Sequence, residues 1–277
     1  MISYGERLVT ALRQRGPLCV GIDPHPGVLT AWDLPGNPTG LERCARGMVE
    51  ALGELVPVFK PQSAFFEAYG AAGVAVLERT LTDIAAVGAL SLLDVKRGDI
   101  GSTMAAYAAA YLTDGSTLAA DAITLSPYLG FGSLEDAIEL AIAQGRGVYV
   151  LALTSNPEGP EIQHAMTADG GTVGQLVIDR AAGHNSGAGL GSVGVVIGAT
   201  IAAPGVDLSR LNGSILAPGL GAQGATVSDL GTVFGTARAN VLPSMSREVM
   251  NAGPAPAALR VAARRALGEM EAAIAVR

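Results

Sequence analysis

Aromatic residues, cysteine and lysine are all scarce in this 277-residue chain, and each scarcity narrows what the protein can be. Aromatic residues make up 4% of the sequence, so the interior has to be built from small aliphatic side chains. The two cysteines, Cys19 and Cys44, are too few for a disulfide framework or a cysteine-rich zinc site. We expect both to be buried, reduced thiols of a cytoplasmic protein.

Positive charge and histidine are also in short supply. The 18 basic residues are outnumbered by 25 acidic ones, and they form no stripe, so a binder of nucleic-acid backbones is not expected. The three histidines, His25, His164 and His184, lack the H-x-H or H-x-x-x-H spacing of a zinc site, and we expect no metal. No targeting sequence or uninterrupted apolar span is visible, so no membrane segment is expected.

Lysine is much rarer than arginine in this chain. Of the 18 basic residues, 16 are arginine and only two are lysine. A bias of the lineage toward arginine would explain that excess, but not the positions of the two lysines, Lys60 and Lys96. Lysine can be tuned to release a proton at working pH, whereas arginine cannot. Both lysines are therefore candidates for chemistry.

Eight short apolar runs recur along the chain, and helical patterns separate them. The runs are rich in Val, Ile and Leu without strict alternation, which is typical of parallel strands covered on both faces. Eight such units and no visible linker predict a closed (β/α)₈ TIM barrel, with residues 1–277 as a single domain, rather than an open doubly wound sheet. The predicted strands are Leu18–Asp23, Val56–Gln62, Ser91–Lys96, Asp121–Pro127, Gly147–Ser155, Ser192–Thr200, Ser214–Leu220 and Ala237–Ser244.

The segments between these runs predict helices and one long loop. We expect Ser133 to cap the helix that follows it, because a serine hydroxyl can accept from a free backbone amide at a helix start. Residues 156–171 carry two prolines and three glycines, and we interpret them as a lid, since loops of this length in compact domains are usually functional or disordered. The principal predicted helices are Leu41–Leu55, Phe65–Ala86, Ile100–Leu112, Thr172–Ala182 and Pro256–Val276.

Charged residues gather where the predicted strands end, which in a barrel is the mouth that carries the chemistry. Asp94 and Lys96 are two residues apart on one strand and are expected to point to the same side. Lys60 ends the neighbouring strand, and Asp99 follows at the next turn. Four charges of alternating sign can thus converge, either as a catalytic array or as a structural ion-pair network.

The motif Asp94-x-Lys96-x-x-Asp99-Ile100 resembles the signature of the orotidine 5′-phosphate decarboxylase family. The resemblance spans all eight predicted strands and is strongest with the longer bacterial subgroup. Further matching segments are Gly21-Ile22-Asp23, Phe59-Lys60-Pro61-Gln62, Leu153-Thr154-Ser155-Asn156-Pro157, Ala217-Pro218-Gly219-Leu220-Gly221-Ala222-Gln223-Gly224 and Pro243-Ser244-Met245-Ser246-Arg247.

The resemblance implies loss of CO₂ from orotidine 5′-monophosphate to give UMP, the last step of de novo pyrimidine nucleotide synthesis, without a metal or an organic cofactor. Lys96 would stabilise the carbanion at C6 of the pyrimidine and then protonate it. Asp94 would face the substrate carboxylate, and Lys60 would hold Asp94 charged and aimed. Asp99 would reach the active site of a partner barrel in a homodimer.

Substrate-binding residues are expected at the ends of several other strands. The string Gly219-x-Gly221-x-x-Gly224 follows the seventh strand, where barrels often hold phosphate, and Arg247 follows the eighth. Gln223 could contact the phosphate or the base. The resemblance further implies that Asp23, with Asp99 and Thr103, binds the ribose hydroxyls, and that Ser155 pairs with the amide edge of the pyrimidine.

Three other functions compete with this interpretation. A metal-dependent sugar-phosphate epimerase or aldol-type lyase would need more His or Glu ligands than the chain offers. A Schiff-base aldolase would use Lys96 as a neutral amine, whereas Asp94 and Lys60 nearby are expected to keep it protonated. A non-catalytic nucleotide-binding barrel would have no need of two buried lysines.

Overall fold

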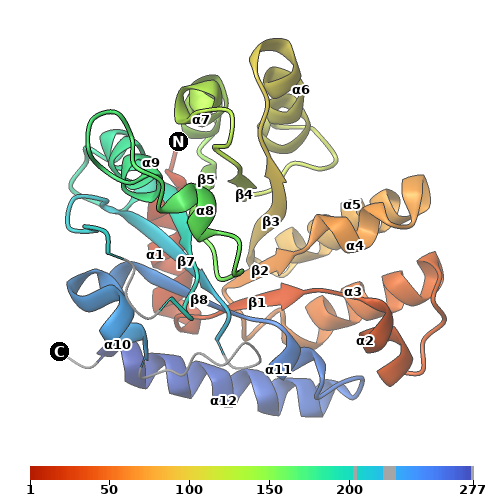
Figure 1. Ribbon diagram of the computed structural model, residues 1–277. Helices are drawn as coiled ribbons and strands as arrows, with labels where there is room; N and C mark the ends of the chain where they lie inside the picture. Colours follow the sequence, from red (N-terminus) through yellow and green to blue (C-terminus); the bar gives the residue numbers. More distant parts are fainter. Residues whose placement is uncertain (202–204, 221–228, 276–277) are drawn as a thin grey trace.

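Eight parallel strands form a closed barrel in which the strands pair in chain order and β8 pairs with β1 (Figure 1). The structure, a computed structural model, describes residues 1–201, 205–220 and 229–275. The predicted single-domain (β/α)₈ barrel is confirmed, and the open sheet is excluded. The strands are β1 (Cys19–Ile22), β2 (Val58–Pro61), β3 (Leu90–Arg97), β4 (Ala122–Leu125), β5 (Gly147–Leu153), β6 (Gly191–Ile197), β7 (Gly213–Pro218) and β8 (Val241–Met245).

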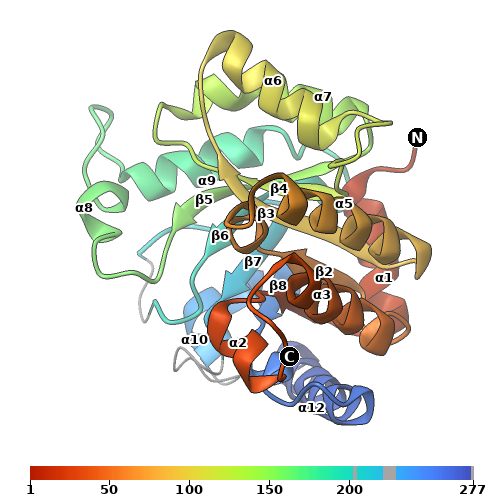
Figure 2. The same ribbon diagram turned by 90° about the vertical axis from the view of Figure 1, so that its right-hand side faces the viewer.

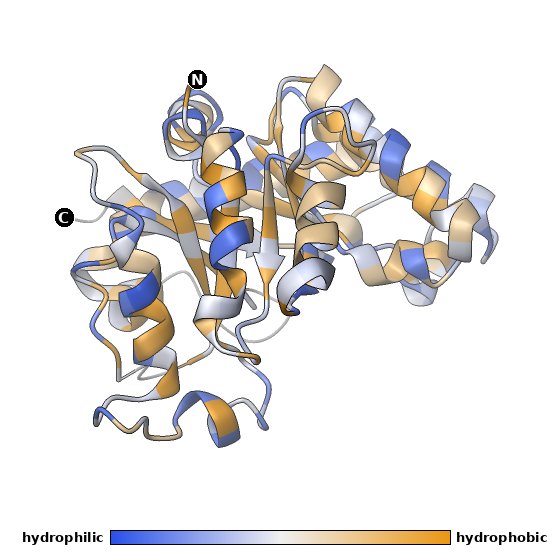
Figure 3. Cartoon of the chain, turned by 90° about the horizontal axis from the view of Figure 1, so that it is seen from above, coloured by the Kyte–Doolittle hydropathy of each residue, from blue (hydrophilic) through white to orange (hydrophobic). Residues whose placement is uncertain are grey.

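Helices surround the barrel and form its outer layer (Figure 2). The helices in the foreground of Figure 3 carry both hydrophobic and hydrophilic residues, as expected when one face is buried and the other meets water. The helices are α1 (Tyr4–Arg15), α2 (Pro26–Ala31), α3 (Pro38–Leu52), α4 (Ser63–Glu67), α5 (Gly70–Ala86), α6 (Gly101–Leu112), α7 (Glu135–Ala143), α8 (Pro160–Gln163), α9 (Val173–Gly183), α10 (Asp229–Phe234), α11 (Arg247–Met250) and α12 (Pro256–Ala275).

Residues along each strand point alternately into the barrel and out toward the helices. On β2, β3, β4 and β8 the inward position nearer the start of the strand is apolar, and the next inward position is polar. Thus Val58 precedes Lys60, and Leu92 precedes Asp94, with the apolar member of each pair buried in the inner core cluster. The interior therefore has an apolar floor and a polar mouth.

The floor of the barrel is closed by α1, which packs Tyr4 and Leu8 against the inner core. The Tyr4 hydroxyl lies 3.0 Å from the hydroxyl of Tyr149 on β5, so each buried phenol has a hydrogen-bond partner. Cys19 lies in this inner cluster and Cys44 lies in the outer one, both as free thiols. The expectation that both cysteines are buried is confirmed, and burial raises the pKa of Cys19 to about 12.

One predicted helix is two helices in the structure. The apolar pattern over 65–86 predicted an unbroken element, but α4 ends at Glu67 and α5 begins at Gly70. Gly70 has a φ of +61°, in the left-handed region that a glycine adopts at little cost. The break lets α4 remain near the barrel mouth while α5 packs along the outside.

Two further boundaries differ from the prediction. Residues 235–240 form a 3₁₀ helix, so β8 begins at Val241 rather than at Ala237. Ser133 lies inside a second 3₁₀ helix, 131–134, and its hydroxyl donates to the carbonyl of Gly130 at 2.7 Å. The prediction that Ser133 caps α7 is wrong, because α7 starts after Leu134 without a side-chain cap.

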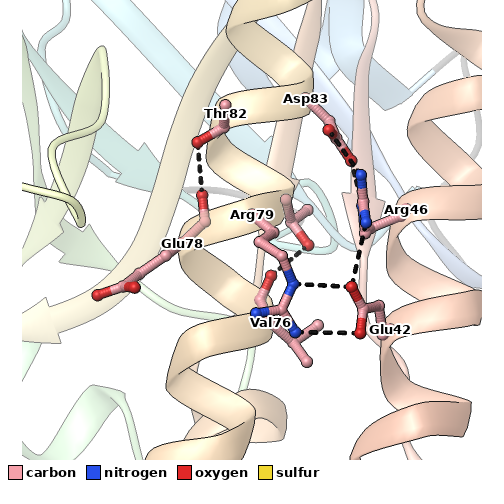
Figure 4. Close-up of polar contacts among 8 residues, drawn as sticks. Glu42, Arg46, Val76, Glu78, Arg79, Thr82 and Asp83 are labelled. Atoms are coloured by element: carbon pink, nitrogen blue, oxygen red, sulfur yellow. Dashed lines mark hydrogen bonds and ion pairs between the residues drawn. The ribbon is translucent and has the colours of Figure 1, made fainter.

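Arginine supplies ion pairs on the outer surface. Arg79 on α5 makes two hydrogen bonds to Glu42 on α3, at 2.7 and 3.0 Å, and Arg46 bridges Glu42 and Asp83 (Figure 4). The flat guanidinium suits such paired contacts. Because these groups are partly solvated, the network is expected to add little to the free energy of unfolding. Arginine thus serves the outer surface here, whereas both lysines lie at the barrel mouth.

Within the described ranges, no helix combines the length and the apolar character that crossing a membrane requires.

Candidate active site

A cavity of about 300 Å³ opens at the carboxyl ends of the strands. This volume lies at the lower end of the range of small-molecule sites. Polar and charged side chains from six strand ends converge on it, which is where barrel enzymes hold their substrates. Its polar and charged lining residues are Asp23, Lys60, Gln62, Asp94, Lys96, Thr124, Thr154, Ser155, Asn156, Ser244, Ser246, Arg247 and Glu248.

Asp94 lies between the two lysines. Lys96 Nζ donates to Asp94 Oδ1 at 2.7 Å, and Lys60 Nζ donates to Asp94 Oδ2 at 3.2 Å. Lys60 also lies 4.0 Å from Asp23 Oδ1. The Lys60 and Asp94 side chains are 8% and 9% exposed, whereas Lys96 is 46% exposed and reaches toward the open side of the cavity. The predicted convergence of Lys60, Asp94 and Lys96 is confirmed.

The buried members of this array are held in their charged forms. Burial by itself would raise the pKa of Asp94, but the charges of Lys60 and Lys96 outweigh it and lower that pKa to about 2. Burial would lower the pKa of Lys60, yet Asp94 and Asp23 raise it above its ordinary value. A buried carboxylate is therefore fixed between one buried cation and one exposed cation.

The strand that carries Asp94 and Lys96 is irregular at this point. Leu93 on β3 pairs with Ile123 on β4, and Arg97 pairs with Leu125, so three β3 residues oppose the single residue between. This bulge places Lys96 at a φ of +45°, a conformation that costs an L-residue about 1–2 kcal/mol. The two side chains still meet, but through a bulge and not through the regular strand that their spacing suggested.

Asp99 and Thr103 do not line this cavity. Asp99 lies beyond the end of β3, and its Oδ1 accepts from the backbone amide of Ile100 at 2.8 Å. Thr103 lies exposed in the first turns of α6. Within a single chain, the fourth charge of the expected array is thus separate from the other three.

The remaining predicted residues occupy the rim and walls. Asp23, Ser155 and Arg247 all line the cavity, from the ends of β1, β5 and β8. Asp23 Oδ1 is buried without a hydrogen-bond donor among the described residues. Gly221 and Gln223 fall in residues 221–228, which lie outside the described part of the chain.

Sequence reasoning gave no role to two residues that the structure places against Asp94. The Thr124 hydroxyl donates to Asp94 Oδ1 at 2.8 Å, and the side chain of Gln62 makes a long, 3.5 Å contact with the backbone oxygen of Asp94. A signal for Thr124 was available, since it is the inward-facing residue after buried Ala122 on β4. Its significance depends on the register between β3 and β4, which the sequence does not display.

The segment after β5 is tied to that strand by one glutamine. Gln163 on α8 accepts from the backbone amide of Thr154 at 2.8 Å and donates to its hydroxyl at 2.6 Å. The segment that carries α8 projects at the left of Figure 2, and Asn156 from its start lines the cavity. This position agrees with the interpretation of residues 156–171 as a lid, which stays a prediction.

Among the described residues, no three His, Cys, Asp or Glu side chains gather as a metal site. The fold and the cavity together define the class of (β/α)₈-barrel enzymes, here with a lysine–aspartate–lysine array in the cavity at the barrel mouth.

Comparisons with known proteins identify the family within this class. A sequence model of the Orotidine 5'-phosphate decarboxylase / HUMPS family matches residues 16–262. Orotidine 5'-phosphate decarboxylases from Salinispora tropica and Streptomyces coelicolor are 60% and 53% identical, each over 99% of both chains. A Streptomyces avermitilis crystal structure assigned to the same enzyme has a TM-score of 0.97 at 55% identity, covering 100% of this chain and 97% of that one.

The chain belongs to the orotidine 5'-phosphate decarboxylase family. It is a carboxy-lyase of that family, whose reaction converts orotidine 5′-monophosphate to UMP in pyrimidine synthesis.

Proposed function

We propose that this chain decarboxylates orotidine 5′-monophosphate to UMP with Lys96 as the proton donor and without a metal ion. The observation that carries the proposal is the Lys96–Asp94–Lys60 array, in which an exposed ammonium 2.7 Å from a buried carboxylate faces the cavity. An assay of UMP formation from purified protein and orotidine 5′-monophosphate tests it, and a chain that yields no UMP would refute it.

The proposed step breaks the bond between C6 and the carboxylate carbon, and CO₂ leaves while the electron pair stays on C6. The Lys96 ammonium stabilises that charge and then donates its proton to C6, after which the amine recovers a proton from water. Asp94 faces the departing carboxylate and raises the energy of the bound substrate. The site has to lower the barrier by on the order of 20 kcal/mol, and preorganised charge is the effect of that size available here.

The Lys60 ammonium positions Asp94 in this scheme. Lys60 contacts Asp94 Oδ2 and Lys96 contacts Asp94 Oδ1, so a rotation of the carboxylate would break both ion pairs. Without the two lysines Asp94 would be a buried, unpaired charge, which is strongly unfavourable. The same pairing supports an enzyme over a binding module, since a binding site gains nothing from this cost.

The ribose is proposed to bind at Asp23. A buried carboxylate oxygen without a donor is costly, and a ribose hydroxyl would supply the missing hydrogen bond to Asp23 Oδ1. Ser155, across the cavity at the end of β5, is proposed to pair with the amide edge of the pyrimidine.

The phosphate is proposed to bind between the ends of β7 and β8. Gly219 and Arg247 line this side of the cavity, and Arg247 begins the short helix α11. A guanidinium can contact two phosphate oxygens at once. Gly221 and Gln223, outside the described residues, are further proposed substrate-binding residues, with Gln223 at the phosphate or at the base.

Replacing Arg247 with alanine is expected to weaken UMP binding far more than uridine binding. The loss for UMP should be roughly 1.5–3 kcal/mol, the size of a hydrogen bond to a charged group. Isothermal titration of both ligands measures it. Arg264→Ala, which removes an exposed arginine from α12, is the control and should bind both ligands normally. Equal losses for UMP and uridine would remove Arg247 from the phosphate site.

Prolonged dialysis against a chelator is expected to leave the decarboxylation rate unchanged. The reason is that Lys96 supplies the cation next to C6 that a Lewis acid would otherwise provide. The rate should be compared before and after dialysis, with added Zn²⁺ and Mg²⁺ as separate samples. A loss that either metal restores would favour the metal-dependent epimerase or lyase.

The Schiff-base alternative needs Lys96 as a free amine. Borohydride treatment in the presence of a carbonyl substrate would trap such an intermediate, and mass spectrometry would locate the added mass. We expect no adduct at Lys96, because its ammonium is paired with Asp94 at 2.7 Å.

We further propose that the active form is a homodimer in which Asp99 and Thr103 complete the partner's site. Both lie outside the cavity of their own chain, near exposed apolar side chains at the ends of β3 and β4. Ile100, Tyr128 and Leu129 are 62%, 75% and 51% exposed. A second copy would cover them and bring a fourth charge to each array. The two buried free thiols agree with a cytoplasmic location for this enzyme.

A further inference from the structure

The hydroxyl of Thr124 joins the two proposed catalytic groups through a single oxygen atom. It donates to Asp94 Oδ1 at 2.8 Å and accepts from the backbone amide of Lys96 at 2.9 Å. The directions are unambiguous, because an ionised carboxylate can only accept and a backbone N–H can only donate. Thr124 is 1% exposed, so water does not replace either contact.

The position of Thr124 in the barrel explains why one hydroxyl can bond both Asp94 and the Lys96 amide. Asp94, Val95 and Lys96 form the bulge of β3, and Thr124 is the single β4 residue opposite them. A regular ladder would pair the Lys96 amide with a backbone carbonyl, but the bulge moves it out of register. The threonine hydroxyl takes the place of that carbonyl.

The backbone of Lys96 needs such a restraint. Its φ of +45° lies in the left-handed region that non-glycine residues rarely occupy, and such conformations persist where the surroundings hold them. The hydrogen bond from the Lys96 amide to the Thr124 hydroxyl restrains that backbone directly, whereas the Lys96 side chain is 46% exposed. A lysine that relaxed to an ordinary strand conformation would aim its ammonium elsewhere.

We infer that Thr124 is a positioning residue for the decarboxylation, and that its hydroxyl holds the Asp94 carboxylate and the Lys96 backbone in one reactive geometry. The inference rests on the proposed function for the identity of the reaction. Thr124 lines the cavity, but the two hydrogen bonds of its hydroxyl go to Asp94 and to the Lys96 backbone and not to the residues proposed to hold the ribose or the phosphate, so its loss should alter turnover more than ligand affinity.

The test compares two pairs of proteins, and the members of each pair differ in the hydroxyl. The first pair is the wild type and Thr124→Val, which keeps the shape of threonine without its hydroxyl. The second pair lacks the methyl group: Thr124→Ser keeps the hydroxyl and Thr124→Ala removes it. We expect kcat to fall roughly 10- to 100-fold in Thr124→Val and Thr124→Ala, the effect of a misplaced reacting group. Thr124→Ser should stay within about threefold of the wild type, since it keeps both hydrogen bonds.

UMP affinity and a matched variant separate positioning from general damage. The dissociation constant for UMP should change by less than about threefold in all three variants, because the hydroxyl of Thr124 is bonded to Asp94 and to the Lys96 amide and not to the proposed ribose and phosphate sites. Thr80→Val is the control: Thr80 is also buried, and its hydroxyl donates to the Val76 carbonyl within α5, far from the mouth. It should lose stability without losing turnover.

Hydrogen exchange of the Lys96 amide tests its hydrogen bond to Thr124 without any substrate. In the wild type this amide is bonded to Thr124, and in Thr124→Val it should exchange at least roughly tenfold faster, as expected for a lost hydrogen bond. Mass spectrometry of peptides that contain Lys96 measures it. Thr124→Ser should keep the protection.

The outcomes are distinct. Wild-type kcat in Thr124→Val, or a Thr124→Ser variant as slow as Thr124→Ala, would overturn the positioning role while leaving decarboxylation intact. UMP affinity that falls in parallel with kcat would show a structural role only. If Thr124→Val does not fold, the Ser and Ala pair decides alone. A wild-type protein that forms no UMP would overturn the proposed function, whatever the exchange data show.

Discussion

Lys96→Ala is expected to lose nearly all turnover, with kcat lower by roughly 10⁴-fold or more. General acid catalysis alone contributes about 10²–10⁴-fold, and a preorganised charge at the developing carbanion adds about 10²–10³-fold. Lys96 supplies both in the proposed mechanism. Its side chain is 46% exposed and leaves no large void when truncated, so the fold should survive. Single-turnover rates and UMP binding of the same preparation measure the two effects.

Lys96→Arg separates the two roles of the lysine. Arginine keeps the positive charge beside Asp94 but cannot release a proton at any working pH. We therefore expect Lys96→Arg to be almost as inactive as Lys96→Ala. Circular dichroism and a retained affinity for UMP show that the site is intact. Substantial activity in Lys96→Arg would exclude proton donation and leave Lys96 a purely electrostatic role.

Mixing inactive Lys96→Ala and Asp99→Ala proteins is expected to restore activity. Each homodimer should be nearly inactive, because every site in it lacks one member of the array. A two-fold interface exchanges equivalent residues, so a heterodimer has one doubly damaged site and one intact site. With random exchange of equal amounts, roughly a quarter of all sites should be wild type. The recovered rate, with exchange followed by native mass spectrometry, measures this.

A second mixture of variants serves as the control for the complementation experiment. Lys96→Ala mixed with Asp94→Asn should stay inactive, because both residues lie in the array of one chain, 2.7 Å apart. No heterodimer of that pair contains an intact site. If the Asp99 mixture also stays inactive although subunits have exchanged, Asp99 acts within its own chain and the shared site is wrong.

Arginine and lysine occupy different places in this fold. Arg46 and Arg79 form flat, paired contacts on the partly solvated outer surface between α3 and α5. Lys60 and Lys96 occupy the barrel mouth, where a compact ammonium can approach one carboxylate oxygen each. The rarity of lysine in the sequence was therefore a usable signal for the site.

The sequence by itself was sufficient for the barrel and for most of the array. Eight buried apolar runs with short connections favour one closed parallel sheet, since each strand must be covered on both faces. The alternation of inward and outward positions places Lys60 and Asp94 above an apolar floor. Asp23, Ser155 and Arg247 followed from strand ends and from the family motifs, and all three line the cavity.

Tertiary structure alone decided how the array is held and what lies outside it. The bulge of β3, the left-handed backbone of Lys96 and the two contacts of Thr124 all depend on the register between β3 and β4, and those two contacts join residues 28 and 30 positions apart in the chain. No local pattern encodes a register, because it is set by the packing of the whole barrel. Likewise, Asp99 is only three residues from Lys96, yet the chain turns at the end of β3 and carries it out of its own cavity. Spacing along a chain predicts neighbours on a regular strand, and it ceases to do so where the strand ends.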